Sequence, residues 1–447
     1  MNDNIAYQSK PSLWARATTM AKDTPPERNR YVDFLRALSI LAVVSGHWLV
    51  AAPYIRDGAV TGGHLLGILP WTQWLTWGFQ VMPLFFLVGG FSNGMSWSAN
   101  RRNGDSYSDW FSSRLQRLIN PVLPLFLAWT LFALFGTAMG VERQIVKLAA
   151  QLALIPVWFL SVYLMICAVV PLSHAAWKRW GMASFAGLVL GSISIDVMAL
   201  YFDVPYVNFL NFAFVWLAIH QLGYAWRDGR FASSARMVLW GLGGLASLAL
   251  LIGIGPYPVA MIGVPGEPLS NSMPPTLALL ALGIAQTGFA LALEPLGRRM
   301  LNNLGAWAAT ILINGMIMTI YLWHLSAFVF VMVAAWLLGG VGLHMDPGSS
   351  QWWMMRPLWF TLYIAALIPL ILAFARYERA GKTAGSHIPH WRLVSGLLLI
   401  CAGLGASAVF SIASPLGITG VRLWIVALPF VGAALVRFGP VYSIARS

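Results

Sequence analysis

Residues 31–50, YVDFLRALSILAVVSGHWLV, decide how this chain folds. They read as an apolar helix, yet Asp33, Arg36 and His47 are ionisable and therefore costly to place in hydrocarbon. Arg36 and His47 are eleven residues apart, which on an α-helix is a net rotation of about 20° and a rise of roughly 16 Å. Asp33 precedes Arg36 by one turn on the same face. The pattern predicts one wall of a functional site that opens at a membrane surface near Arg36 and reaches mid-bilayer at His47.

The composition excludes an ordinary soluble protein. Of 447 residues, 58% are hydrophobic and 10% are charged, and the mean hydropathy is +0.70, whereas about a quarter of residues are charged in soluble domains. The net charge of +13 does not indicate nucleic-acid binding, because the basic residues form short clusters between apolar runs, as topology signals do. Cys167 and Cys401 lie within such runs, so no disulfide framework is expected.

Apolar runs long enough to span a bilayer, roughly 17 to 25 residues, recur along the whole chain. There are twelve of them, at 33–53, 74–97, 118–139, 154–172, 182–201, 207–226, 237–255, 276–294, 307–339, 357–375, 393–412 and 421–437. We expect the long ninth run to be tilted or to extend beyond the bilayer, and residues 255–275, rich in Pro and Gly, to be irregular. The predicted fold class is an all-α, polytopic transmembrane helix bundle of about twelve helices.

The basic residues predict the topology of this bundle. Residues 1–30 are polar and lack the apolar core of a cleavable signal, so they are expected to form a flexible cytoplasmic tail. Residues 98–117 are expected to be a polar, basic inner loop. The outer segments hold few basic residues: Arg56, Arg143, Lys147, Arg356 and Arg422. This asymmetry follows the positive-inside rule and predicts that both termini are cytoplasmic.

Histidines within or at the ends of the runs are candidates for acid–base chemistry. We expect His174 to be interfacial and His220 to be structural. For His324, in the stretch YLWH, an interhelical hydrogen bond and a functional role are equally open. His47 follows Ser45-Gly46, which permit close backbone approach, and shares a face with Arg36, so a functional role is favoured there. Asp33 and Asp196 are the acids that could orient a histidine.

Arg114 and Arg117 are one helical turn apart, at the predicted cytoplasmic end of the next helix. Two guanidinium groups at this spacing can clamp a phosphate, although ordinary positive-inside charge would also explain them. Together with Arg36 they could hold a polyanion at the inner end of a cavity whose deep end is His47. The sequence has no P-loop, HExxH, CxxC or GxSxG motif, so no ATP-driven, zinc-dependent or α/β-hydrolase chemistry and no bound metal or cofactor is expected.

These residues resemble the signature of the acyltransferase-3 family of membrane proteins. The similarity begins with YVDFLRAL at 31–38 and Gly46-His47, an Arg-x10-His pattern in the first helix. It continues with MPLFFLVGGF at 82–91, Arg114-x-x-Arg117 followed by Pro121, WFL at 158–160, and YLWH at 321–324. The resemblance implies a membrane acyltransferase core at 31–380, of about ten helices. Residues 381–447 would then add two further C-terminal helices and a tail.

The resemblance also implies an activity and roles for the candidate residues. Members transfer an acyl group, often acetyl, from cytoplasmic acyl-CoA to a hydroxyl of a cell-envelope glycan, glycolipid or similar acceptor. His47 would be the general base, assisted by His324, and Arg36, Arg114 and Arg117 would bind the CoA phosphates. One departure from the family pattern is that no buried carboxylate clearly matches as the partner of His47, so Asp33 is our catalytic candidate, beside Asp196. The expected partners are acyl-CoA as co-substrate, the acceptor and membrane lipids, in a multi-pass protein of the bacterial cytoplasmic membrane.

Two other classes of function compete with this interpretation. Twelve helices with mid-membrane ionisable groups also suit a transporter or flippase of a lipid-linked or small polar substrate, but no internal repeat is visible and the ordered Arg and His motifs argue against it. A structural or sensor membrane protein is the third alternative, and it predicts that His47 can be replaced without loss of function.

Overall fold

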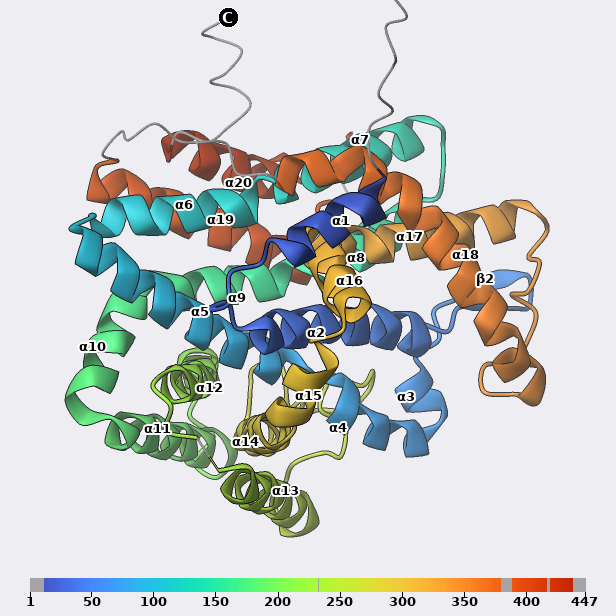
Figure 1. Cartoon of the computed structure of the whole chain (residues 1–447). Helices are drawn as coiled ribbons and strands as arrows, with labels where there is room; N and C mark the ends of the chain where they lie inside the picture. The colour runs from blue at the N-terminus through green and yellow to red at the C-terminus, as the bar shows by residue number, and fades with distance from the viewer. Residues whose placement is uncertain (1–11, 232, 379–387, 416–418, 437–447) are drawn as a thin grey trace, which may run out of the picture.

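The structure of the protein is a computed structural model that describes residues 12–231, 233–378, 388–415 and 419–436. It is built from helices, with one small hairpin (Figure 1). The first helices are α1 (Leu13–Lys22), α2 (Arg30–Val50), α3 (Leu65–Ile68), α4 (Thr76–Phe79), α5 (Met82–Asn103), α6 (Tyr107–Ile119), α7 (Val122–Ala138), α8 (Arg143–Leu154), α9 (Val157–Ala168), α10 (Val170–Trp180) and α11 (Met182–Leu200).

The remaining elements complete the bundle. They are α12 (Asn211–Arg227), α13 (Ser234–Ile254), α14 (Leu277–Ala292), α15 (Glu294–Met300), α16 (Leu304–Asn314), α17 (Ile317–Leu337), α18 (Ser350–Phe374), α19 (His390–Phe410) and α20 (Leu423–Leu435). Short 3₁₀ turns η1 (Pro70–Leu75), η2 (Val207–Leu210) and η3 (Ala375–Glu378) link some of them. Strands β1 (Tyr54–Arg56) and β2 (Ala59–Thr61) pair antiparallel.

The predicted class, an all-α polytopic bundle, is confirmed, but the count of twelve spans is not. Within the described residues nine helices are long and apolar enough to cross a membrane, or ten if α14 and α15, bent by 51°, form one span. Two of the twelve predicted runs, at 207–226 and 421–437, are not among these helices. Helix α20, with 13 residues, is too short to span, whereas α12 has 17 residues and follows directly on η2.

Three segments differ from what their sequence led us to expect. The run at 307–339 is not one long helix but two, α16 and α17, separated at Gly315-Met316. Residues 98–117 are mostly helical rather than a loop, since α5 and α6 cover them. Within 1–30, residues 13–22 form α1, which packs against α16. In contrast, 255–275 contain no helix, as predicted.

Helix α2 lies in the middle of the molecule and contacts α5, α16 and α17 (Figure 1). It begins after Asn29, whose side chain accepts hydrogen bonds from the first backbone N–H groups of the helix, a cap that stabilises a helix by about 1 kcal/mol. It ends at Val50 because Pro53 follows closely and biases the chain before it toward extended conformations. Tyr31 anchors the first turn by donating to the carbonyl of Ala290 at 2.6 Å.

Helix α17 is held at its N-terminus by a carboxylate. The oxygens of Glu378 accept hydrogen bonds from the backbone N–H groups of Met318 (3.0 Å) and Thr319 (3.2 Å). Negative charge at a helix N-terminus is favourable because the unpaired N–H groups there carry partial positive charge. Tyr321 then links the same helix to α9 through a 2.6 Å hydrogen bond to the carbonyl of Pro156.

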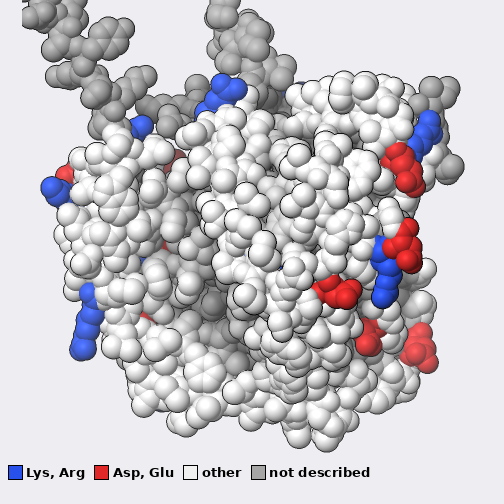
Figure 2. All heavy atoms as spheres, turned by 90° about the vertical axis from the view of Figure 1, so that its right-hand side faces the viewer, with Lys and Arg blue, Asp and Glu red and all other residues white. Residues whose placement is uncertain are grey.

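The two ends of the bundle have different surfaces. We call the end that carries β1–β2 and the C-terminus of α2 the hairpin side, and the end at the N-terminus of α2 the arginine side. Figure 2 views the molecule from the hairpin side, where charged side chains are few and lie toward the edges. The irregular segment 255–275 packs inward there, with Asn271 donating to the carbonyls of Pro258 and Ala260.

The packing of α5 against α12 gives a stability prediction. A Cβ placed on Gly90 would lie 1.9 Å from the carbonyl oxygen of His220, whereas a Cβ on Gly243 of α13 would meet nothing within 4 Å. We expect Gly90→Ala to force the two helices apart and cost roughly 1–3 kcal/mol. Gly243→Ala, the matched control, should not lower stability, because alanine meets nothing there and is the better helix former. Thermal unfolding in detergent measures both; equal midpoints would contradict the proposed close packing.

Candidate active site

His47 and His324 come from positions 277 residues apart and meet in the interior of the bundle. Nδ1 of His47 lies 2.8 Å from Nε2 of His324, and the imidazole planes are within 4° of parallel, with centroids 5.1 Å apart. His324 is completely buried, while His47, in the last turn of α2, is partly exposed. The structure therefore brings together the two candidate histidines, one from α2 and one from α17.

A backbone carbonyl sets the arrangement of protons in this pair. Nδ1 of His324 lies 2.7 Å from the carbonyl oxygen of Tyr321, and because a carbonyl only accepts, Nδ1 must carry a hydrogen. When both rings are neutral, Nε2 of His324 is then the acceptor and Nδ1 of His47 the donor. This leaves the lone pair of His47 on Nε2, an atom for which the described residues supply no hydrogen-bond partner.

Neighbouring contacts fix the orientation of both rings. The indole N–H of Trp48, next to His47, donates to the backbone carbonyl of His324 at 3.0 Å and so ties α2 to α17. The small residue before His47 also matters, since a Cβ at Gly46 would approach the ring of Phe79 to 3.3 Å. The two histidines are therefore held together by the bond between their imidazoles and by contacts of the residues next to His47.

Arginines from two helices converge on one face of α5, on the arginine side of the histidines. Nη2 of Arg36 donates to the hydroxyl of Ser92 at 3.1 Å. Nε of Arg114 donates to the amide oxygen of Asn93 at 3.0 Å, and the same guanidinium also bonds Ser96. Neighbouring residues of α5 therefore position a guanidinium from α2 and one from α6.

Arg117 completes this group. It lies one turn after Arg114 on α6, is exposed, and is close enough to Arg36 for the two charges to repel one another. We call Arg36, Arg114 and Arg117 the arginine cluster. Several positive charges brought together without an equal number of carboxylates favour binding of an anion with more than one negative charge.

Asp33 and Asp196 do not contact either histidine of the pair. Asp33 forms ion pairs with Arg28 (2.8 Å) and Arg36 (3.4 Å), and it precedes His47 by 14 residues, about 21 Å along α2. Its contacts place it with the arginines, rather than with the base that we expected it to assist. Asp196 instead accepts hydrogen bonds from Asn211, Tyr257 and the backbone of Leu277.

Asn93 is a site residue that the sequence analysis missed. Its amide oxygen holds Arg114, while its nitrogen lies 3.1 Å from Nε2 of the buried His220. His220 thus has the structural surroundings that we expected of it. His174 lies elsewhere, 3.4 Å from the guanidinium of Arg227. A primary amide within an apolar helix is the signal that could have identified Asn93, because such a group needs a partner inside the bundle.

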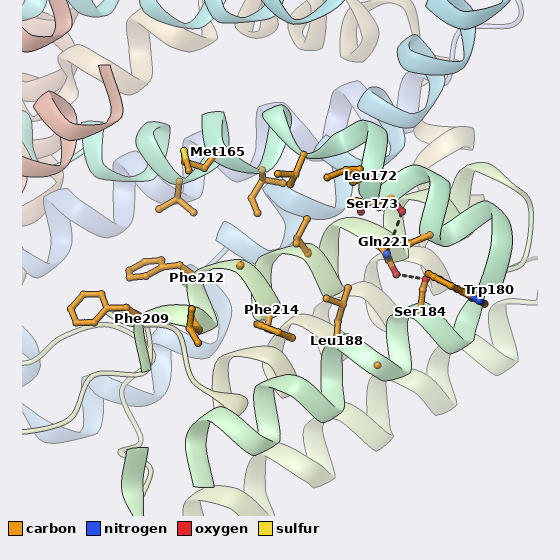
Figure 3. A pocket seen from close by; sticks show the side chains of 18 of the residues that line it. Met165, Leu172, Ser173, Trp180, Ser184, Leu188, Phe209, Phe212, Phe214 and Gln221 are labelled. Carbon is orange, nitrogen blue, oxygen red and sulfur yellow. Dashed lines mark hydrogen bonds between the residues drawn. The ribbon is translucent and has the colours of Figure 1, made fainter. Parts of the chain in front are cut away.

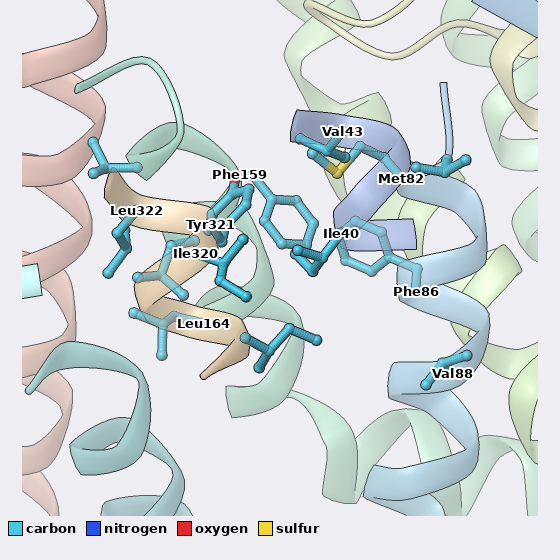
Figure 4. Close-up of a cluster of buried hydrophobic side chains, with 14 of the residues drawn as sticks. Ile40, Val43, Met82, Phe86, Val88, Phe159, Leu164, Ile320, Tyr321 and Leu322 are labelled. Carbon is cyan, nitrogen blue, oxygen red and sulfur yellow. The ribbon is translucent and has the colours of Figure 1, made fainter. Parts of the chain in front are cut away.

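An apolar layer separates the arginine cluster from the histidine pair. It consists of Ile40, Val43, Phe86, Phe159 and Tyr321 (Figure 4). Ile40 and Val43 lie on α2 between Arg36 and His47. The ring of Phe159 packs 5.5 Å from that of Phe86 and 6.0 Å from that of Tyr321, measured between centroids. In this conformation, the direct path along α2 between the two polar groups is filled with side chains.

A cavity of about 660 Å³ reaches His47 from the hairpin side. Its walls are the C-terminal part of α2, the hairpin, the α3–η1–α4 segment, α8 and α17. We call it the histidine cavity. Because His47 lines it, the unpaired Nε2 can meet a molecule that occupies this space.

A second cavity, of about 870 Å³, lies between α9–α10 and α11–α12 and contains neither member of the histidine pair (Figure 3). Its walls are almost wholly apolar. At one end Ser184 donates to Gln221 at 2.8 Å, and Gln221 donates to the carbonyl of Ser173 at 3.4 Å. Nothing in this cavity suggests acid–base chemistry.

The fold and the site define an integral membrane protein with a candidate general base at the end of a buried cavity. The family comparison agrees with the resemblance in the sequence. The chain belongs to the acyltransferase-3 family, whose sequence model, described as an acyltransferase domain, matches residues 29–376. The protein is therefore a membrane acyltransferase. The matched region ends before α19 and α20, so these two helices lie outside the family domain. Neither the curated proteins nor the solved structures compared with the chain gave a significant match.

The carbonyl of Tyr321 gives a prediction about His47. We expect ¹⁵N NMR of histidine-labelled protein at neutral pH to show His47 with its hydrogen on Nδ1 and a bare Nε2. Free histidine prefers the opposite tautomer, so the assignment is informative. In His324→Ala the acceptor is lost, and the Nδ1–H form should no longer dominate. A wild-type spectrum with the hydrogen on Nε2 would contradict the proposed proton arrangement.

Proposed function

We propose that the protein is an O-acyltransferase that moves an acyl group, most simply acetyl, from acyl-CoA to a hydroxyl of a cell-envelope glycan, glycolipid or similar acceptor. Acyl-CoA would approach from the cytoplasmic side of a bacterial cytoplasmic membrane and act as a co-substrate. The observation that carries this proposal is the position of His47, which presents an unpaired imidazole nitrogen to the histidine cavity in a chain of the acyltransferase-3 family.

His47 acts as the general base. Its Nε2 takes the proton of the acceptor hydroxyl while the oxygen attacks the thioester carbonyl, forming a tetrahedral intermediate. The carbon–sulfur bond then breaks, and the imidazolium returns the proton to the leaving thiolate, so that an ester and free CoA are formed. His324 accepts the Nδ1–H of His47 throughout and is the positioning partner. Base catalysis of this kind is worth about 10²- to 10⁴-fold in rate.

The arginine cluster binds the phosphates of CoA. Guanidinium groups pair with phosphate oxygens through two hydrogen bonds at once, and Ser92 and Asn93 hold two of them in place. Asp33 acts here by orienting Arg36 and not as the partner of the base. From Arg36 to His47 is roughly 16 Å along the helix, a span that suits an extended pantetheine arm. That arm has to displace the apolar layer on its way to His47.

The catalytic assignment is tested by acyl transfer from radiolabelled acetyl-CoA in membranes that contain endogenous acceptors. His47→Ala should retain acetyl-CoA binding but lose about 10²-fold or more in transfer. His324→Gln, which keeps a hydrogen-bond acceptor, should keep more activity than His324→Ala. If His47→Ala transfers at the wild-type rate, His47 is not the base.

The arginine cluster is tested by acetyl-CoA affinity. Arg36→Ala and Arg114→Ala should each weaken binding about tenfold or more, since each removes a charge-assisted contact worth roughly 1.5–3 kcal/mol. Arg56→Ala is the matched control, because Arg56 is exposed on β1, at the hairpin side. Calorimetric titration of the purified protein measures the affinities. Unchanged affinity in both variants would remove the phosphate-binding role.

A further inference from the structure

The histidine cavity is uncharged. Of the described residues that line it, none is an Asp, Glu, Lys or Arg. Most are aliphatic or aromatic, including Leu49, Leu66, Phe79, Leu152 and Phe328. A pocket of this kind gains affinity chiefly by removing apolar surface from water, and it discriminates against charged groups, which lose their hydration on entering.

The polar atoms in its walls are largely committed to the protein itself. The hydroxyl of Thr72 donates to the carbonyl of Leu69 at 2.6 Å, and the amide nitrogen of Gln80 donates to the carbonyl of Met261 at 3.3 Å. An exception is His64, whose Nδ1 is buried and has no partner among the described residues. That nitrogen is covered by protein, so the polar group that the cavity chiefly offers a molecule is the imidazole of His47, in largely apolar surroundings.

Several apolar side chains that line the cavity are also exposed on the outside of membrane-spanning helices, and we take this side as its mouth. Leu148 on α8 and Trp336 on α17 both line the cavity and are 56% and 45% exposed. Both helices belong to segments that are long and apolar enough to span a bilayer. On the other side of the mouth, Leu75 and Phe79 are also exposed. These exposed apolar surfaces suit contact with lipid chains, which makes this side of the cavity the candidate entrance.

We infer that the acceptor is an uncharged amphiphile that enters the histidine cavity sideways from the membrane. Its apolar body fills the cavity, and its reacting hydroxyl reaches Nε2 of His47. A free, hydrophilic glycan is not the acceptor, because the walls provide too few unpaired polar groups to replace its water. This inference rests on the proposed acyl transfer and specifies the substrate class for the same site.

Photo-crosslinking tests the location of the acceptor. The probe is dodecyl glucoside with a diazirine in its alkyl chain, added to the full-length protein in lipid nanodiscs, with labelled peptides identified by mass spectrometry. We expect labelling of residues 145–152 and 329–336 that excess dodecyl glucoside suppresses and excess glucose does not. Labelling spread evenly over the lipid-facing surface, or competed equally by glucose, would overturn the inference.

A matched pair of variants makes the result specific to the mouth. Leu148→Trp places an indole in the entrance, whereas Leu131→Trp makes the same change on α7, away from the cavity, at a side chain that is also 56% exposed. Tryptophan is well tolerated at membrane surfaces, so both variants should fold. We expect competable labelling to fall about tenfold in Leu148→Trp, a loss of roughly 1.4 kcal/mol, and to stay unchanged in Leu131→Trp. Equal labelling in the two variants would contradict the lateral entrance.

Acetyl-CoA binding, measured on the same samples, separates this inference from the proposed function. If acetyl-CoA binds and the probe does not label the cavity, the substrate class is wrong and the acyl-CoA site stands. If the probe labels the cavity and acetyl-CoA does not bind, the proposed donor is wrong. If palmitoyl-CoA, but not dodecyl glucoside, suppresses the labelling, the cavity holds the donor's acyl chain and the inference is overturned.

Discussion

The hydrogen bond between His47 and His324 is the contact on which the candidate site depends. It joins α2 to α17. The carbonyl of Tyr321 requires the hydrogen of His324 to be on Nδ1, so His47 is the donor in this bond and His324 the acceptor. Many acid–base sites use a carboxylate to orient the base. Inside a membrane a charged carboxylate is expensive unless it is paired, whereas a neutral imidazole accepts the same hydrogen bond without adding charge. This is a physical reason for a second histidine in place of an aspartate.

Much of the fold could be predicted because the bilayer requires long apolar helices, and the sequence shows where they lie. The stretch at 31–50 corresponds almost residue for residue to α2. The number of spans could not be predicted from hydropathy alone. Helix α12 is largely surrounded by protein, so it can hold the buried polar residues Asn211, His220 and Gln221, which make it less apolar than a lipid-facing span. The break at Gly315 was missed because glycine is common within transmembrane helices.

The candidate site was predictable only where its residues share a helix. The periodicity of α2 places Arg36 and His47 on one face, and α6 does the same for Arg114 and Arg117. The pairing of His47 with His324 depends on α2 and α17 lying side by side, which no local pattern encodes. Asp33 was assigned to the wrong group for a related reason: sharing a helical face with His47 did not make it a neighbour, because the distance along the axis is too great.

The apolar layer gives the two ends of the site different chemistries. In the proposed reaction the arginine cluster retains the phosphates of the donor, and the histidine cavity holds an uncharged acceptor, so neither substrate has to carry charge through the bundle. The neutral thioester arm is the part that must pass Ile40 and Phe159. Displacing packed apolar side chains by an arm of partly apolar character costs far less than moving a phosphate through the same space. In the proposed reaction, a layer of this kind therefore admits the thioester arm, while its packed apolar side chains disfavour the passage of ions.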